Sequence, residues 1–226
     1  MDFSTPVKTE KGSFALNHKQ LILSMGSCFS ENIGEKLSEQ KFQIDVNPFG
    51  ILYNPASIAS SLRILINDRR FTQDDLFFRE GSMHSYAHHS RFSHPEAGEC
   101  LKRINERIAL SASRLQSLDC LMITFGTAYV YRLKNDGEIV ANCHKMPENL
   151  FNRSRLSVDE IVDDWKGLIE QLYALNPALK ILFTVSPIRH LKDGAHGNQL
   201  SKAILLLAIE KLNQIFPNIS YFPAYE

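Results

Sequence analysis

The amino-acid sequence predicts an α/β fold in which helices cover both faces of a parallel β-sheet. Short apolar runs alternate with segments of helical periodicity about five times, an order typical of parallel strands joined by crossover helices. The chain has 226 residues, of which 44% are hydrophobic. This length suits one sizeable domain and is short for two. We therefore expect a single domain over residues 1–226.

The first part of the chain predicts two strands, each followed by a helix. Residues 21–23 are an apolar run typical of a strand buried on both faces, and helical spacing begins at Ser30. Residues 42–46 predict the second strand, which ends at the turn signal NPFG of residues 47–50. Residues 53–55, reading YNP, open the second helix with a proline in its first turn.

Residues 71–95 carry little periodicity but hold four of the eight histidines, which are His84, His88, His89 and His94. Because a buried core seldom has this composition, we expect a loop or short hairpin at the surface. A long helix is expected over residues 96–115. A strongly apolar strand is expected over residues 118–125, and it ends at Gly126.

The last part of the chain begins with an excursion from the main sheet. The turn signal Asn135-Asp136-Gly137 lies between two short apolar runs and predicts a hairpin there. Ser157 and Glu160 have the spacing of a capping box and mark the start of a helix. The pattern then predicts a strand over residues 179–185, a helix over residues 198–214 and a last strand over residues 219–222.

Four segments should meet at the carboxyl edge of this sheet, where open parallel sheets bind their ligands. They are residues 26–30, 47–50, 126–129 and 186–190. The first segment holds two nucleophile-capable side chains, Ser27 and Cys28, beside a helix start whose unpaired N–H groups can stabilise negative charge. One hypothesis is that Ser27 or Cys28 attacks a carbonyl group. The alternative is that small residues only allow a sharp bend of the backbone.

Charge and composition argue against several kinds of partner. Acidic and basic residues number 25 each, so no basic surplus indicates nucleic acid or an anionic membrane surface. No apolar segment reaches membrane-spanning length, and the N-terminus lacks the form of a signal peptide. The four cysteines have neither paired nor metal-type spacing, which favours a reducing cytoplasm. The histidines lack ligand spacing too, so we expect neither a metal nor a cofactor.

The segment GSCFS of residues 26–30 resembles the signature of the GSCFA family, with serine in place of the final alanine. Four further blocks extend the resemblance over nearly the whole chain: NPFGILYNP, HHSRFS, TFGTAYVYR and SPIRHLKDGAHGNQLSKA. That family is grouped with the SGNH, or GDSL-type, hydrolases. The resemblance implies a flavodoxin-like three-layer α/β/α sandwich with a five-stranded parallel sheet. It also implies an esterase or related acyl hydrolase.

The resemblance assigns the nucleophile at the level of the superfamily. The first SGNH block is Gly-Asp-Ser, with the serine as nucleophile. An ungapped match gives the nucleophile's place to Cys28 and the place of the aspartate to Ser27. A helix N-terminus would suit a thiolate at Cys28, since it lowers the pKa of a thiol. A shift by one residue gives the nucleophile's place to Ser27, and both remain candidates. The turn at Gly26 and the backbone N–H group of Gly126 would supply donors to the oxyanion.

Two later SGNH blocks match in part or not at all. The block Gly-x-Asn-Asp supplies an oxyanion donor from its asparagine, whereas here Gly126 precedes Thr127. The second donor would then be Thr127 or Asn54, and losing such a donor costs about a hundred- to a thousandfold in rate. The terminal block Asp-x-x-His is absent, so we expect that the sequence is truncated at its C-terminus.

The alternative is that the general base comes from elsewhere in this chain. The candidates are His190, with Asp193 as its orienting acid, and His89 or the adjacent His88. Arg189 could bind an anionic group of the substrate. Together these residues predict a hydrolase or acyltransferase acting on a small-molecule or carbohydrate ester. The alternatives are a catalytically degenerate binding module for a sugar or acyl ligand, and a fold retained for assembly with a partner protein.

Overall fold

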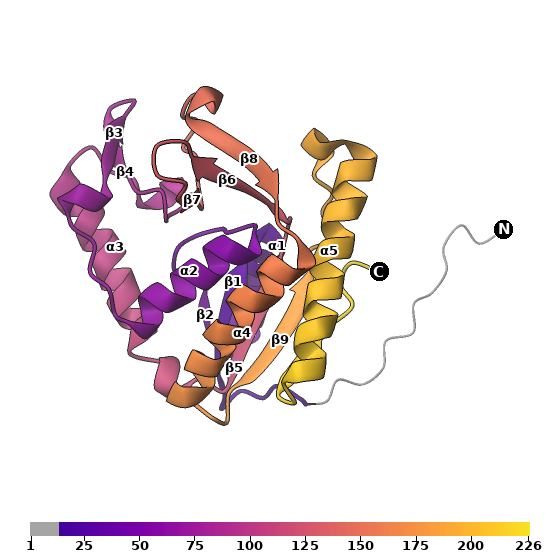
Figure 1. Ribbon diagram of the computed structural model, residues 1–226. Coiled ribbons are helices and arrows are strands. Elements are labelled where there is room, and N and C mark those ends of the chain that lie inside the picture. The colour runs from indigo at the N-terminus through magenta and orange to yellow at the C-terminus, as the bar shows by residue number, and fades with distance from the viewer. Residues whose placement is uncertain (1–13) are drawn as a thin grey trace.

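The computed structural model describes residues 14–226, which form an α/β sandwich (Figure 1). Its main sheet consists of parallel strands in the order β10-β9-β5-β1-β2. These strands are β1 (Leu21–Gly26), β2 (Gln43–Val46), β5 (Cys120–Phe125), β9 (Lys180–Val185) and β10 (Ile219–Tyr221). The predicted five-stranded parallel sheet is therefore confirmed.

Helices cover both faces of this sheet, as predicted. They are α1 (Cys28–Glu39), α2 (Pro55–Ile66), α3 (Ala97–Ala112), α4 (Val158–Leu175) and α5 (Gly194–Ile215). Figure 1 shows α2 and α4 in front of the sheet and α1 behind it. The strand order explains this arrangement, because β1 to β2 and β5 to β9 run outward in opposite directions, and right-handed crossovers then use opposite faces. Within residues 14–226, no helix is both long and apolar enough to cross a membrane.

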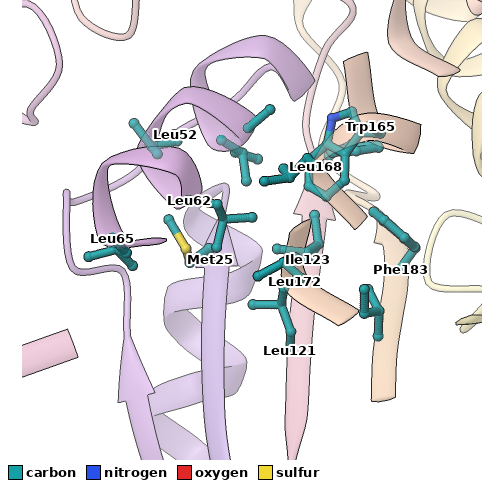
Figure 2. Packing of buried hydrophobic residues seen from close by; sticks show 14 of the residues in the cluster. Met25, Leu52, Leu62, Leu65, Leu121, Ile123, Trp165, Leu168, Leu172 and Phe183 are labelled. Carbon is teal, nitrogen blue, oxygen red and sulfur yellow. The ribbon is translucent and has the colours of Figure 1, made fainter. Parts of the chain in front are cut away.

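The hydrophobic core lies between the sheet and the layer formed by α2 and α4 (Figure 2). Trp165 of α4 packs edge-on against Phe125 and Phe183, with ring centroids 5.1 and 5.2 Å away. Its indole N–H donates to the Pro55 carbonyl oxygen at 3.3 Å, which fixes α4 against the start of α2. The other labelled side chains in Figure 2 are Met25, Leu52, Leu62, Leu65, Leu121, Ile123, Leu168 and Leu172. Their burial is the main favourable contribution to packing the helices on the sheet.

The structure differs from the prediction at the first strand-to-helix connection. β1 continues through Gly26, which pairs with Thr124 of β5, and α1 begins at Cys28 rather than at Ser30. The small residues before the helix carry no apolar pattern. Backbone pairing with β5 holds them in the strand, and this pairing leaves no signal in the local sequence.

A second sheet has the order β7-β6-β8 and lies above the carboxyl ends of the main sheet in Figure 1. The predicted hairpin is confirmed as β6 (Tyr129–Leu133) and β7 (Ile139–Val140), paired antiparallel. The strand β8 (Phe151–Arg155), which also pairs antiparallel with β6, was not predicted. Its sequence FNRSR is exposed after the first residue, so it lacks the alternation that marks a half-buried strand.

The histidine-rich segment forms the expected hairpin, β3 (Phe77–Arg79) with β4 (Ser82–His84). Its expected surface position is wrong for His88, whose exposed fraction is 1%. The His88 ring stacks on Phe49 with centroids 4.8 Å apart and meets Phe71 and Phe92 edge-on. Aromatic neighbours therefore bury an imidazole that composition alone assigned to the surface. The remaining short elements are 3₁₀ helices at Gln73–Asp75, Ser90–Phe92, Leu115–Ser117, Glu148–Leu150 and Leu191–Asp193.

His88 should make the protein sensitive to acid. Burial lowers the pKa of His88 from 6.5 to about 3. Between these two values the unfolded chain binds a proton that the folded protein excludes, so stability falls as pH falls. For one histidine this loss is about 2 kcal/mol between about pH 6.5 and pH 5. The variant His88→Phe keeps a ring against Phe49 and should lose about 2 kcal/mol less than the wild type over that interval in urea denaturation.

The variant His196→Gln is the control for this prediction, because His196 is exposed on α5. It should keep the acid sensitivity of the wild type. Equal acid sensitivity in His88→Phe and the wild type would contradict the role given to His88.

Candidate functional site

The four segments expected at the carboxyl edge of the sheet do meet there. The Ser27 backbone N–H donates to the Thr124 carbonyl oxygen at 3.3 Å, which holds the first turn against the end of β5. The Gly26 N–H donates to Asn47 Oδ1 at 2.9 Å, which links the ends of β1 and β2. The Ser186 N–H donates to the Phe125 carbonyl oxygen at 2.8 Å, and this bond extends the pairing of β5 and β9.

The turn between β1 and α1 presents its two nucleophile candidates differently. Ser27 is the N-cap of α1, and its hydroxyl oxygen accepts a bond from the Phe29 N–H at 3.3 Å. Its exposed fraction is 1%, because Gly126 packs directly against it. Cys28 is the first helical residue and is half-buried. Of the two side chains, the Cys28 thiol is therefore the more accessible.

A cleft of about 700 Å³ opens between the carboxyl edge and the sheet formed by β6, β7 and β8. Five of the predicted site residues line it, namely Asn54, His89, Thr127, His190 and Asp193. Its other lining residues include the rings of Tyr53, Tyr129 and Tyr131. Neither Ser27 nor Cys28 belongs to the lining. The nucleophile candidates thus lie next to the cleft and not inside it.

Tyr53 connects the cleft with the turn. Burial raises the pKa of the Tyr53 phenol, and the charges of Cys28 and Glu31 raise it further, so its ring lies in their electrostatic range. The same ring meets the His190 ring edge-on, with centroids 5.7 Å apart. Tyr53 was not predicted as a site residue, since a tyrosine before a helix is common and carries no distinctive spacing.

Several predicted oxyanion donors are already engaged. The Gly126 and Thr127 N–H groups both donate to the Tyr53 carbonyl oxygen, at 2.7 and 2.9 Å. The Thr127 hydroxyl group is 3.1 Å from Ser201 Oγ and accepts from the Tyr129 N–H at 3.1 Å. The Gly26 N–H, as described, is bonded to an asparagine side chain. The three N–H groups are therefore engaged and are not free to donate to a substrate in this structure.

Asn54 is the predicted donor that the structure leaves available. Its Oδ1 caps α2 by accepting the Ser57 N–H at 2.8 Å. Because the Ser57 N–H needs an acceptor, the amide atom that faces the helix is the oxygen, and the amide nitrogen Nδ2 faces away from the helix. Among the described residues, Nδ2 has no hydrogen bond, and Asn54 lines the cleft with an exposed fraction of only 6%. The helix cap therefore holds a donor in place.

His190 has the environment of a neutral imidazole. Burial lowers its pKa, and the positive charge of Lys202 lowers it further. The predicted partner Asp193 does pull the pKa of His190 upward, but its carboxylate forms an ion pair with Arg153. Asp193 therefore pairs with Arg153. The contacts of the described residues do not support the prediction that Asp193 orients His190 through a hydrogen bond.

Two predicted basic side chains remain, His89 and Arg189, and only His89 lines the cleft. His89 is half-buried at the cleft, its Nδ1 accepts the Arg91 N–H at 3.3 Å, and burial lowers its pKa. Arg189 is exposed and does not line the cleft. Within residues 14–226, no group of three or more His, Cys, Asp or Glu side chains is placed to hold a metal ion.

Sequence reasoning missed two cations of this region. The Arg153 guanidinium lies over the Tyr129 ring at 4.0 Å and near the Tyr131 ring at 5.5 Å. Lys202 of α5 is completely buried, with an exposed fraction of 0%. A signal for Lys202 existed, because it precedes the buried Leu205 and Ile209 at helical spacing and so lies on the inner face of α5.

The fold and this edge define an α/β protein with a candidate ligand site at the carboxyl ends of its strands. The GSCFA family model matches residues 21–226, and the chain belongs to the GSCFA family. No curated protein matched the chain. Among solved structures, it is similar to an acetyl xylan esterase, Est2A, from the rumen bacterium Butyrivibrio proteoclasticus. That similarity has a TM-score of 0.29 and 17% identity, and it covers 47% of this chain and 28% of the esterase.

Proposed function

We propose that this protein is an SGNH-type hydrolase or acyltransferase that acts on an ester or acylated carbohydrate, with Cys28 as its nucleophile. The observation that carries the proposal is the half-buried Cys28 thiol at the first position of α1, at the carboxyl edge of a parallel sheet and beside an open cleft. Membership of the GSCFA family supports the same activity. Ser27 is the weaker candidate because its hydroxyl group is buried and caps the helix.

The reaction would proceed through a thioester. His190 takes the proton of the Cys28 thiol while the sulfur attacks the carbonyl carbon of the substrate. The tetrahedral intermediate collapses when the C–O bond to the alcohol breaks, and His190 returns the proton to the departing alcohol oxygen. Water, or a second alcohol in an acyl transfer, then attacks the thioester carbon. His190 removes its proton and delivers it to the sulfur, which restores the thiol and releases the product.

The oxyanion would be stabilised by the helix start and by Asn54. The first turn of α1 presents N–H groups that have no partner within the helix, and its dipole favours negative charge. The Asn54 amide nitrogen supplies a side-chain donor in place of the missing asparagine of the SGNH block. The cleft offers tyrosine faces and polar side chains, a combination suited to a sugar that carries the acyl group.

Acyl transfer to the protein itself tests this proposal. After brief incubation with p-nitrophenyl acetate, peptide mass spectrometry should find one acetyl group on Cys28, which hydroxylamine removes. Cys143 is the internal control, because it is also half-buried and lines the cleft while burial raises its pKa to about 11. Acetylation of Ser27 would reassign the nucleophile. An unmodified turn would contradict the hydrolase proposal.

A binding module for a sugar or acyl ligand is the second candidate. Two observations favour it: Ser27 and Cys28 lie outside the lining of the cleft, and the Gly126 and Thr127 amides are engaged by Tyr53. This function predicts an unmodified turn together with saturable binding of acetylated oligosaccharides, measured by calorimetry. Loss of that binding in Tyr129→Ala would locate the ligand in the cleft.

A further inference from the structure

Lys202 is a buried cation that the proposed reaction does not use. Its side chain is 0% exposed. No ion pair joins it to a carboxylate of the described residues. Moving an ammonium group out of water without a counter-charge is unfavourable. A buried charge of this kind is therefore a candidate for a functional role.

The contacts of Lys202 lie at the carboxyl edge of the sheet. Its Nζ donates to the carbonyl oxygens of Gly126 and Ser186, each at 2.7 Å. These residues directly follow β5 and β9, so one side chain ties the ends of two adjacent strands. The ring of Tyr225 lies 5.6 Å from Nζ. The two carbonyl dipoles and the ring offset part of the free-energy cost of removing the ammonium group from water. They carry no negative charge, so they do not neutralise it.

One of the two strand ends that Lys202 holds, the end of β5, adjoins the turn that carries Cys28. A Cβ atom built on Gly126 would lie 3.5 Å from Ser27 Cβ, so Gly126 contacts both that turn and the ammonium group. Burial lowers the pKa of Lys202 to about 8, and the charge of Cys28 opposes this effect. The charge of Lys202 in turn lowers the pKa of His190. Lys202 is thus in electrostatic range of both groups of the proposed reaction.

We propose that Lys202 is a positioning residue whose buried ammonium group stabilises the thiolate of Cys28 and keeps His190 neutral. This inference rests on the proposed function for the roles of Cys28 and His190. A neutral imidazole is the form that can accept the thiol proton. When that proton passes to His190, the ammonium group balances the negative charge left on the sulfur. The bonds to Gly126 and Ser186 hold the cation in place for this task.

Alkylation of Cys28 tests the inference without an ester substrate. The variant Lys202→Met removes the charge with a side chain of similar length. At pH 7, iodoacetamide should modify Cys28 about tenfold more slowly in this variant than in the wild type, measured on the Cys28 peptide by mass spectrometry. The matched control is Lys211→Met, because Lys211 lies on the same helix and is exposed, with an ion pair to Asp159 at 2.8 Å. It should react within about twofold of the wild-type rate.

Cys120 separates a loss of charge from a loss of fold. It is fully buried in β5, so its alkylation reports unfolding. If Lys202→Met exposes Cys120, the measurement is made on Lys202→Gln, whose amide group can still donate to carbonyl oxygens but carries no charge. Wild-type alkylation of Cys28 in a folded variant would overturn the inference. A protein without esterase activity whose Cys28 still depends on Lys202 would refute the proposed function and leave this inference standing.

Discussion

Replacement of Cys28 by alanine should lower kcat/KM for p-nitrophenyl acetate by at least about a thousandfold. Alanine has no sulfur with which to form the thioester, so only the helix start and Asn54 would remain to assist direct attack by water. Initial rates over a range of substrate concentrations measure the effect. Thermal denaturation should show a folded protein, because within residues 14–226 the half-buried thiol makes no hydrogen bond that holds the turn.

Ser27→Ala is the matched control for the Cys28 variant, since it alters the neighbouring residue of the same turn. The variant loses the N-cap bond to the Phe29 N–H and should lose about 1 kcal/mol of stability. Its activity should stay within about threefold of the wild type, because the hydroxyl group does not take part in the reaction. The reverse pattern of activities would give the nucleophile's role to Ser27. Two fully active variants would rule out nucleophilic catalysis at this turn.

Gly26→Ala should destabilise the protein by more than about 3 kcal/mol. Gly26 has φ of +143°, a conformation that L-residues rarely adopt, and an added Cβ would lie 2.2 Å from the Thr124 carbonyl oxygen. The clash involves backbone atoms of paired strands, so it cannot be relieved by rotating a side chain. Urea denaturation measures the loss, and a partly unfolded variant should also lose the bond from the Gly26 N–H to Asn47.

Gly167→Ala is the control for this second prediction. Gly167 lies inside α4, and a Cβ built there meets no atom within 4 Å. Alanine has a higher helix propensity than glycine, so this variant should gain about 0.5–1 kcal/mol. A stability of Gly26→Ala equal to that of the wild type would show that the β1–β5 pairing can shift, and the geometry of the turn would then need revision.

The parts of the site that sequence could predict are those tied to strand ends. The Gly26–Cys28 turn and His190 each follow a predicted strand, and the rule for parallel sheets placed them at one edge. Asn54 was proposed through the family resemblance, as a replacement for a missing oxyanion donor. Tyr53 and Lys202 were not predicted as site residues, because their roles depend on contacts between distant segments. The engagement of the Gly126 amide by the Tyr53 carbonyl oxygen, for example, joins the start of α2 to the end of β5.

His88 is another residue whose environment depends on distant segments of the chain. Composition assigned His88 to the surface, yet Phe49, Phe71 and Phe92 enclose it. Phe92 lies four residues after His88, but Phe49 and Phe71 come from segments well before it, and no local spacing brings those two rings to His88. The polar strand β8 is a second example, since its pairing with β6 rests on backbone hydrogen bonds that nearly any sequence can form.

The amino-acid sequence by itself determined the α/β class, the parallel sheet and the edge at which the unusual residues gather. Alternating apolar runs and helix caps are local signals, and the topology of crossovers leaves few other solutions. Only the tertiary structure decided which of the two neighbouring side chains is accessible, which amide donors remain free, and where a cation is buried. Those properties depend on burial and on hydrogen-bond partners from distant segments, and such contacts exist only once the chain has folded.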